Sequence, residues 1–437
     1  MVVNSMSYAT YESYKDSGVD WLGEIPSDWE LGRISAFFSE RRQKVSDKDY
    51  PALSVTKLGV FPQWENVAKS NDGDNRKLVK KGDFVINSRS DRKGSSGIAK
   101  QDGSVSLINI VLKPVNIEPR YSEYLFKSYN FIEEFYRVGH GIVADLWTTR
   151  FDDIKNSMIA LPTFDEQVKI ANFLDQKTAQ IDQAIALKQQ QIEKLNEYKQ
   201  IVIQNAVTKG LNPNVPMKDS GVEWIGDIPE HWNVIRFRNA FRFNKGLNIT
   251  KENLNDEQGI LCLNYGEIHS KYGFEFIPNV HPLKFVDESY LKNNQKSLLN
   301  DGDFVFADTS EDIEGSGNFS YINGQDLVFA GYHTLIAKPK INFNSRFIAY
   351  VLDSSAFRNQ VRLRVKGVKV FSITQAILKT TFIWLPTEQE QNEIVKYLDE
   401  KMQKFNNAKI AYQIQIDRLK EYKNILINQA VTGKIKI

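Results

Sequence analysis

The sequence has few of the residues that build metal centres, disulfides or membrane spans. Its 437 residues contain one cysteine, Cys262, which excludes an internal disulfide and a cysteine-rich zinc module. The five histidines are scattered, without the short spacing of metal ligands. No apolar run approaches the roughly 20 residues that a membrane-spanning helix needs, and the first residues lack the apolar core of a signal peptide. We therefore expect a cytoplasmic protein.

An excess of charge of one sign is also missing. Lysine and arginine number 56 and aspartate and glutamate 54, so the formal net charge is only +2. Any nucleic-acid-binding surface must therefore be local. The hydrophobic fraction of 41% is enough to build sizeable cores, which excludes disorder as the main state. At about 150 residues per domain, the length allows two or three domains.

The motifs of common catalytic sites are missing too. The sequence has no Walker A run, no GxGxxG after a strand, no Asn-Pro-Pro-aromatic motif of an amino-methyltransferase and no GxSxG. Glu-x-Lys pairs occur at 197–199 and 421–423, but both lie on expected helices, where charged residues are ordinary solvated flanks. We expect no catalytic residues, no metal site and no cofactor in this chain.

What the sequence does contain is an internal repeat: one unit occurs twice. KDSGVDWLGEIPSDW at 15–29 matches KDSGVEWIGDIPEHW at 218–232 at ten of fifteen positions. GDF recurs at 82–84 and 302–304, LPxxxEQ at 161–167 and 385–391, and EYKxxxIxxAVT at 197–208 and 421–432. The ends of the two copies match most closely, so two similar modules coexist in one molecule.

Each copy divides into a β-rich part and a long helix. Short runs such as DFVIN, VSLINIVLKP, DFVFA and LIAKP predict strands. After each Leu-Pro, an acidic start and about 40 residues without glycine or proline predict a helix of roughly 60 Å that ends at Gly210 or Gly433. We expect a mixed α/β (α+β) fold with four segments: 1–160 (first recognition domain), 161–210 (first spacer helix), 211–385 (second recognition domain) and 386–437 (second spacer helix).

Both helices carry a narrow apolar stripe with a heptad period, which predicts a coiled-coil seam. The economical way to cover both stripes is an antiparallel pairing of the two helices, with one module at each end and a pseudo-twofold axis between them; self-pairing of two chains is the alternative. The expected interface residues are Leu174, Ile181, Ile185, Ile192, Leu195, Val202, Leu398, Met402, Phe405, Tyr412, Ile416, Leu419 and Leu426.

Two basic runs indicate nucleic acid as a partner. Residues 76–100 hold eight basic and two acidic residues, and residues 357–369 hold five basic residues and no acid. Such patches neutralise phosphates, although a solvated basic face is the plainer explanation of either one alone. The residues expected to contact DNA are Lys57, Trp64, Arg76, Lys77, Arg89, Arg92 and Lys93 in the first module and Lys245, Lys271, Arg362, Arg364, Lys366 and Lys369 in the second.

The order and duplication of these motifs resemble the specificity subunit of type I restriction-modification systems. The resemblance covers nearly the whole chain and rests on the two WxGxIPxxW segments, the two GDF segments, the two LPxxxEQ segments and the two EYK segments. It implies two target-recognition domains that each read half of a split site in double-stranded DNA. It also implies two methyltransferase subunits that use S-adenosylmethionine, and restriction subunits that use ATP and Mg²⁺.

The two copies differ after GDF. The first continues INSRSDRKGSSG and the second FADTSEDIEGSG, so a basic stretch is replaced by an acidic one. Carboxylates can accept hydrogen bonds from cytosine amino groups where such a loop touches DNA, but we expect the second module to rely mainly on Lys245, Lys271 and the run 358–369. The two modules are therefore expected to read different half-sites. Trp21, Trp29, Trp224 and Trp232 are expected to pack where each module meets the helices. The competing function is a coiled-coil scaffold with two protein-binding modules, which predicts no salt-sensitive binding of duplex DNA.

Overall fold

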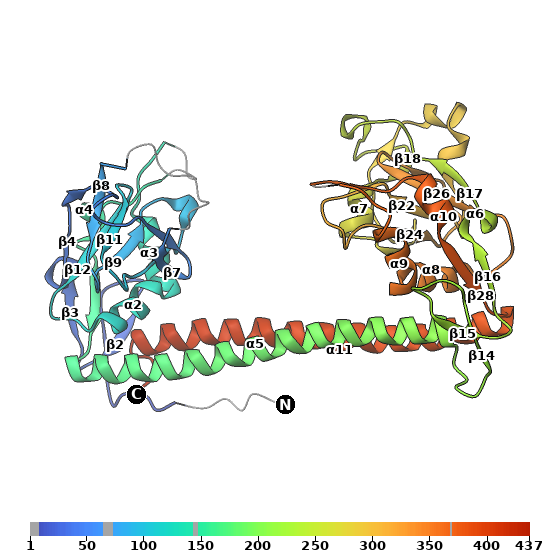
Figure 1. Cartoon of the computed structure of the whole chain (residues 1–437). Helices are drawn as coiled ribbons and strands as arrows, with labels where there is room; N and C mark the ends of the chain where they lie inside the picture. Colours follow the sequence, from blue (N-terminus) through green and yellow to red (C-terminus); the bar gives the residue numbers. More distant parts are fainter. Residues whose placement is uncertain (1–7, 64–72, 143–146, 368) are drawn as a thin grey trace. The chain divides into compact units, whose positions relative to one another are not determined.

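The computed structural model describes residues 8–63, 73–142, 147–367 and 369–437. The chain divides into two compact units, residues 1–189 with 413–437 and residues 190–412. Each unit contains one β-rich domain and one half of each of two long helices (Figure 1). In the described part of the chain, no helix has both the length and the apolar character that a membrane crossing requires.

The first domain is built from small, mostly antiparallel sheets. Its main sheet has the strand order β10-β9-β12-β4, and a second sheet has the order β11-β8-β5. The remaining sheets are the pairs β1-β2, β13-β3 and β6-β7. The strands are β1 (Tyr14–Asp16), β2 (Glu24–Pro26), β3 (Glu30–Arg33), β4 (Phe38–Glu40), β5 (Lys44–Val45), β6 (Leu53–Thr56), β7 (Gly59–Pro62), β8 (Arg76–Val79), β9 (Phe84–Asn87), β10 (Ser96–Ile98), β11 (Gly103–Ser106), β12 (Asn109–Pro114) and β13 (Met158–Leu161). The helices are α1 (Ile34–Phe37), η1 (Ser90–Arg92), α2 (Pro119–Lys127), α3 (Tyr129–Arg137) and α4 (Phe151–Ile154).

The second domain repeats this plan with additions. Its main sheet has the order β17-β26-β22-β24-β19, and a four-stranded sheet has the order β20-β18-β25-β21. The strands are β14 (Met217–Asp219), β15 (Asp227–Pro229), β16 (Asn233–Arg236), β17 (Phe241–Lys245), β18 (Ile260–Leu263), β19 (Phe274–Phe276), β20 (Phe285–Val286), β21 (Leu298–Leu299), β22 (Phe304–Ala307), β23 (Thr309–Ser310), β24 (Phe319–Ile322), β25 (Val328–Ala330), β26 (Thr334–Pro339), β27 (Phe371–Ser372) and β28 (Phe382–Leu385). The helices are α6 (Phe237–Ala240), η3 (Lys251–Asn253), α7 (Tyr265–Ser270), η4 (Glu288–Lys292), η5 (Gln295–Ser297), α8 (Ser345–Asp353), α9 (Ser355–Arg362) and α10 (Gln375–Thr380).

The predicted strands form the centres of these sheets. DFVIN and DFVFA become β9 and β22, which pair with β12 and β26 in antiparallel register. The run VSLINIVLKP, expected as one strand, is divided between β11 and β12, which belong to different sheets. A turn at Leu107 and Ile108, between the polar residues Ser106 and Asn109, separates them, and the chain crosses there from one sheet to the other.

The two long helices are α5 (Phe164–Lys209) and α11 (Glu388–Val431). In the first unit, Asp182 of α5 accepts two hydrogen bonds from Lys423 Nζ of α11, at 2.8 and 2.7 Å. In the second unit, Tyr198 of α5 packs edge-on against Phe405 of α11, with ring centroids 5.6 Å apart. Early residues of one helix therefore contact late residues of the other in both units, so the pairing is antiparallel.

The thirteen residues expected at the seam all turn away from solvent. Leu174, Ile181, Ile192, Val202, Leu398, Ile416 and Leu426 are buried, and Ile185, Leu195, Met402, Phe405, Tyr412 and Leu419 are half-buried. The seam continues into the domain cores. Leu174, Ile181 and Leu426 belong to the core of the first unit, and Val202 and Leu398 to that of the second.

Each long helix ends against the repeated IPxxW segment of a domain. Gly210, with φ +72°, follows α5, and a Cβ at this position would lie 3.3 Å from the ring of Trp232. Gly433, with φ +70°, follows α11 and is equally close to Trp29. Trp29 and Trp232 are fully buried, as expected of packing residues. Trp224 is 37% exposed and Trp21 is half-buried, so these two tryptophans are less enclosed than Trp29 and Trp232.

The seam generates a stability prediction. Leu398 is fully buried in the core that joins α11 to the second domain, and truncating it leaves a cavity. We expect Leu398→Ala to lower the free energy of unfolding by about 2–5 kcal/mol, measured by urea denaturation. The control is Ile410→Ala on the same helix, because Ile410 is 58% exposed and its loss should change stability by less than about 0.5 kcal/mol. Equal effects of the two substitutions would contradict the seam.

Candidate nucleic-acid interface

The repeated GDF segment starts the central strand of each domain. Gly82 and Gly302 have φ of +92° and +82°, a conformation that favours glycine. Asp83 is buried and accepts from the guanidinium of Arg41 at 2.7 and 3.1 Å. Asp303 is buried beside Lys338 Nζ at 2.7 Å, and its burial raises the pKa of its carboxyl above the usual range despite that ion pair. The motif therefore fixes the strands that lead to the two loops described next.

The first loop, residues 88–95, connects β9 to β10 and is named here the basic loop. Arg89 and Arg92 flank Asp91, with Arg89 Nε 3.1 Å and Arg92 Nε 3.9 Å from its carboxylate oxygens. Lys93 Nζ lies 2.7 Å from Glu133 in α3. The side chains of Arg89, Arg92 and Lys93 are 37%, 69% and 42% exposed, so all three cations can reach an external anion.

Two basic residues that the sequence suggested as DNA contacts have other roles. Arg76 is 5% exposed, and its guanidinium donates to the side chain and carbonyl of Ser104 at 2.9 and 3.1 Å. Burial lowers the pKa of Arg76. Lys77 Nζ is held by Glu40 at 3.1 Å and by the carbonyl of Asn109 at 2.8 Å. Both predictions are corrected, because these cations already bind groups inside the fold.

The remaining candidates in the first domain divide between a turn and an undescribed segment. Lys57 is exposed in the turn between β6 and β7. This turn lies against β10, since a Cβ on Gly97 would lie 2.9 Å from Cα of Gly59. Lys57 therefore lies two residues before Gly59, the residue of β7 that approaches β10. Strand β10 directly follows the basic loop. Trp64 lies outside the described residues.

The equivalent loop of the second domain, residues 308–318, connects β22 to β24 and is named here the acidic loop. It carries four carboxylates and no basic residue: Asp308, Glu311, Asp312 and Glu314. The basic run of 358–369 packs directly beside it. Arg362 Nη2 donates to the carbonyl of Glu314 at 2.7 Å, and Arg358 Nη1 donates to Asn318 Oδ1 at 2.8 Å. Strand β27, which follows the run, pairs with β23 in the loop.

The six cations expected in the second domain therefore differ in availability. Arg362 is partly buried, which lowers its pKa, and Arg364 Nη1 donates to the carbonyl of Gln360 at 2.6 Å. Lys366 and Lys369 are exposed next to the acidic loop. Lys271 is exposed after α7, near one edge strand, β19, whereas Lys245 ends the opposite edge strand, β17. Lys245 pairs with Leu335 of β26, which pairs with Phe306 near the start of the acidic loop, so Lys245 lies at the same end of the main sheet as this loop.

A cavity of about 720 Å³ lies between α7 and the acidic loop. His269 from α7 is held there by the carbonyl of Thr309 at 2.7 Å and by Asn318 at 2.9 Å. Tyr265 and the carboxylate-bearing residues Glu311 and Glu314 also line it. Sequence reasoning missed Tyr265 and His269, because they lie about 40 residues before the loop in a segment without a repeated motif. Within the described residues, no group of three metal-ligating side chains converges.

The family of the chain follows from comparison with known proteins. The model of the type I restriction modification DNA specificity domain matches the chain twice, at residues 26–197 and 229–415. These two matches cover most of the sequence, one in each repeated unit. The chain belongs to the family of type I restriction-modification specificity subunits, which supports a role in DNA recognition.

Similar proteins match over nearly their full length. The MjaVIII type I restriction enzyme specificity subunit of Methanocaldococcus jannaschii is 25% identical, and the match covers 94% of both chains. The putative MjaX specificity subunit of the same organism is 24% identical, covering 95% of this chain and 96% of the other. Among solved structures, a chain of a type I R-M system matches with a TM-score of 0.67 and 16% identity over 93% of this chain and 98% of its own length. The HsdS subunit from Thermoanaerobacter tengcongensis matches with a TM-score of 0.51 and 16% identity over 94% of this chain and 98% of its own length. These two structures support the fold.

The basic loop generates a test of DNA contact. Reversing Arg89, Arg92 and Lys93 together to glutamate should weaken duplex binding by the assembled complex. It should also flatten the log–log dependence of affinity on salt by about 0.9 for each phosphate that the loop no longer neutralises. Reversing three exposed helix lysines, Lys194, Lys404 and Lys420, is the matched control and should leave the slope unchanged. An unaltered slope in the loop variant would identify the basic loop as an ordinary solvated face.

Proposed function

We propose that this chain is the sequence-reading subunit of a type I restriction-modification complex, and that each of its two domains reads one half of a bipartite DNA site. The observation that carries the proposal is the combination of one scaffold with two different loops. In both domains, GDF leads into the central strand and the IPxxW segment packs against the end of a long helix. The loops that follow the central strands nevertheless have opposite charge.

The opposite charges suit two different readings. Arg89 and Arg92 carry the forked donors that recognise acceptors on guanine or on phosphate. Glu311 and Glu314 carry acceptors that recognise exocyclic amino groups of bases. Lys366 and Lys369, beside the acidic loop, supply the positive charge that would hold the second domain on the phosphate backbone. The proposed half-sites therefore differ in sequence.

The proposal also assigns the chemistry to partner proteins. In it, two methyltransferase subunits and restriction subunits associate with this chain in the cytoplasm, and S-adenosylmethionine, ATP and Mg²⁺ are bound by them. The chain itself performs no catalytic step and positions the partners on DNA. The long paired helices support a spacer role, because a continuous helix fixes a length of about 1.5 Å per residue.

Sequencing of DNA methylation tests the proposed function directly. Cells that carry this gene and its partners should show one bipartite motif of methylated adenine, and deletion of the gene alone should abolish methylation at every copy of that motif. A protein-binding scaffold would leave the methylation pattern unchanged. Re-expression of the intact gene in the deletion strain is the control.

Exchange of one domain tests whether the two readings are independent. Replacing residues 30–158 with the same segment of a related protein should change one half-site of the methylated motif. The other half-site and the gap between them should stay as they were, because the second domain and the paired helices are unaltered. A change in both half-sites, or in neither, would contradict two independent readers.

A further inference from the structure

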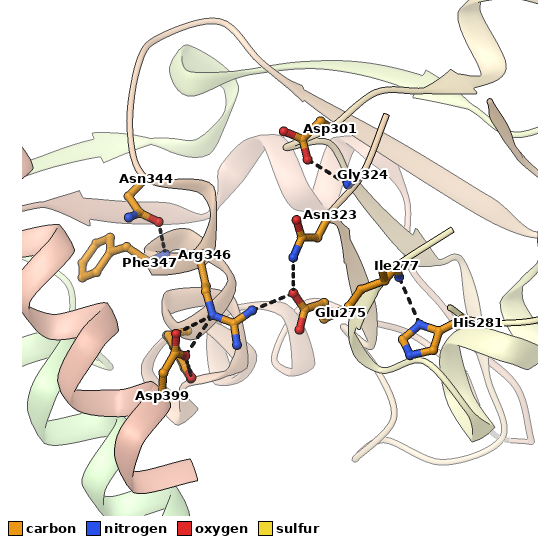
Figure 2. Close-up of polar contacts among 11 residues, drawn as sticks. Glu275, Ile277, His281, Asp301, Asn323, Gly324, Asn344, Arg346, Phe347 and Asp399 are labelled. Atoms are coloured by element: carbon orange, nitrogen blue, oxygen red, sulfur yellow. Dashed lines mark hydrogen bonds and ion pairs between the residues drawn. The ribbon is translucent and has the colours of Figure 1, made fainter. Parts of the chain in front are cut away.

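A network of charged and polar side chains attaches the second domain to α11. Arg346 and Tyr350 lie four residues apart on α8 and therefore on one face. Arg346 Nε donates to both oxygens of Asp399 in α11, at 2.8 and 2.9 Å. Tyr350 donates its hydroxyl to the same carboxylate at 2.5 Å. Figure 2 shows Asp399 on α11 facing Arg346 on α8.

A second attachment lies nearer the start of α11. Gln391 is 4% exposed, and its amide nitrogen donates to the carbonyl of Pro386 at 3.0 Å. Its amide oxygen accepts from the backbone N–H of Asn344 at 2.8 Å. Asn344 in turn caps α8 by accepting from the N–H of Phe347 at 3.1 Å. The repeated glutamine of LPxxxEQ therefore ties the start of α8 to the start of α11.

The first domain repeats both attachments on α5. Arg120 Nη1 and the Tyr124 hydroxyl reach Asp175 at 2.9 and 2.7 Å. Gln167 donates to the carbonyl of Pro162 at 3.0 Å and accepts from the backbone N–H of Glu118 at 2.9 Å. The same residue types hold α2 on α5 and α8 on α11. An unrelated surface contact would have no reason to recur at both places.

Two attachments along one helix fix an orientation better than one. Gln391 and Asp399 are eight residues apart, which is about 12 Å along the helix axis. Hydrogen bonds to charged groups are directional and are roughly twice as strong as neutral ones. Burial alone would lower the pKa of Arg346, but its ion pairs with Glu275 and Asp399 outweigh burial and raise it. The arginine is therefore charged and held by both carboxylates.

The network continues from the helix into the main sheet of the second domain. Arg346 Nη1 donates to Glu275 in β19 at 2.7 Å, and Asn323 Nδ2 donates to the same carboxylate at 2.7 Å. Asn323 directly follows β24, the strand that leaves the acidic loop. Figure 2 shows Asn323, Glu275, Arg346 and Asp399 as one connected series. Asn323 lies at the end of β24 away from the acidic loop, so these contacts join α8 and α11 to the main sheet of the second domain.

We propose that Arg346, Tyr350 and Asp399, with Arg120, Tyr124 and Asp175 in the first domain, are positioning residues that hold each recognition domain at one angle on its helix. In this role they set how strictly the complex measures the gap between the two half-sites, without contacting DNA. The inference rests on the proposed function, because a gap exists only if two half-sites are read.

The test uses the full chain assembled with its partner subunits. Duplexes carry both half-sites with the natural gap, or with one base pair more or fewer, and affinity is measured for each. Asp399→Asn should reduce discrimination against the wrong gaps by about tenfold, a change the size of one mismatched base pair. The preferred bases in each half-site should not change. Asp175→Asn should have the same effect from the other domain.

The matched control is Asp417→Asn, which removes the same charge from an exposed position of the same helix and should keep the natural gap preference. Tyr350→Phe removes only one hydroxyl and should relax the gap preference less than Asp399→Asn, so it serves as the test if the aspartate variant does not fold. Folded variants that measure the gap as strictly as the unmodified chain, or that alter the preferred bases, would overturn the positioning role. Failure of the unmodified complex to prefer any gap would instead reject the proposed function.

Discussion

The structure depends on the burial of the apolar stripes of α5 and α11. Each stripe is narrow, and neither helix would be stable alone in water. An isolated helix is only marginally stable in water, and most of the stability of a helix in a protein comes from packing of its apolar face. Because α5 and α11 pair in antiparallel fashion in both units, each one ends at the domain from which the other begins. Val202, Ile203 and Ala206 of α5 enter the core of the second unit, and Leu426 and Ala430 of α11 enter that of the first. The folding unit is therefore not the sequence repeat, since each domain completes its core with a helix from the other copy.

This arrangement explains which residues are the same in the two copies. The ends of the helices pack on the repeated tryptophans of IPxxW. The buried GDF aspartates each bind a half-buried cation, and the LPxxxEQ glutamines join domain and helix. These contacts are internal and do not depend on which DNA sequence is read. The basic and acidic loops occupy equivalent places between paired strands and carry opposite charge. A shared frame with divergent loops is the arrangement that two different readings require.

The sequence predicted the features that local signals specify. Heptad spacing, an acidic start and a terminal glycine were enough to place both long helices and all thirteen seam residues on their buried sides. Charge counting was less informative, because it cannot find partners that lie far away in the sequence. Arg76 donates a hydrogen bond to Ser104 and Lys77 to Glu40, and each partner is about 30 residues or more away in the sequence. Part of the basic run therefore makes contacts inside the domain. Arg346 and Asp399 are separated by 53 residues, so their pairing cannot be found by counting charges along the chain. The sequence signals for this network are the Arg-x-x-x-Tyr spacing shared by α2 and α8 and the Leu-Asp-x-Lys segment that recurs at 174–177 and 398–401.

The difference between the two attachments follows from the extra strand of the second domain. Each arginine binds one carboxylate on a long helix and one supplied by its own domain. In the first domain the second carboxylate is Glu118, which also caps α2. In the second domain the cap is Asn344, which has no charge, and Glu275 takes over this role from β19. Within the described residues, the main sheet of the first domain has no strand corresponding to β19. The additional strand is thus joined to α11 through the arginine, and its glutamate supplies the second ion pair that the uncharged cap of α8 does not.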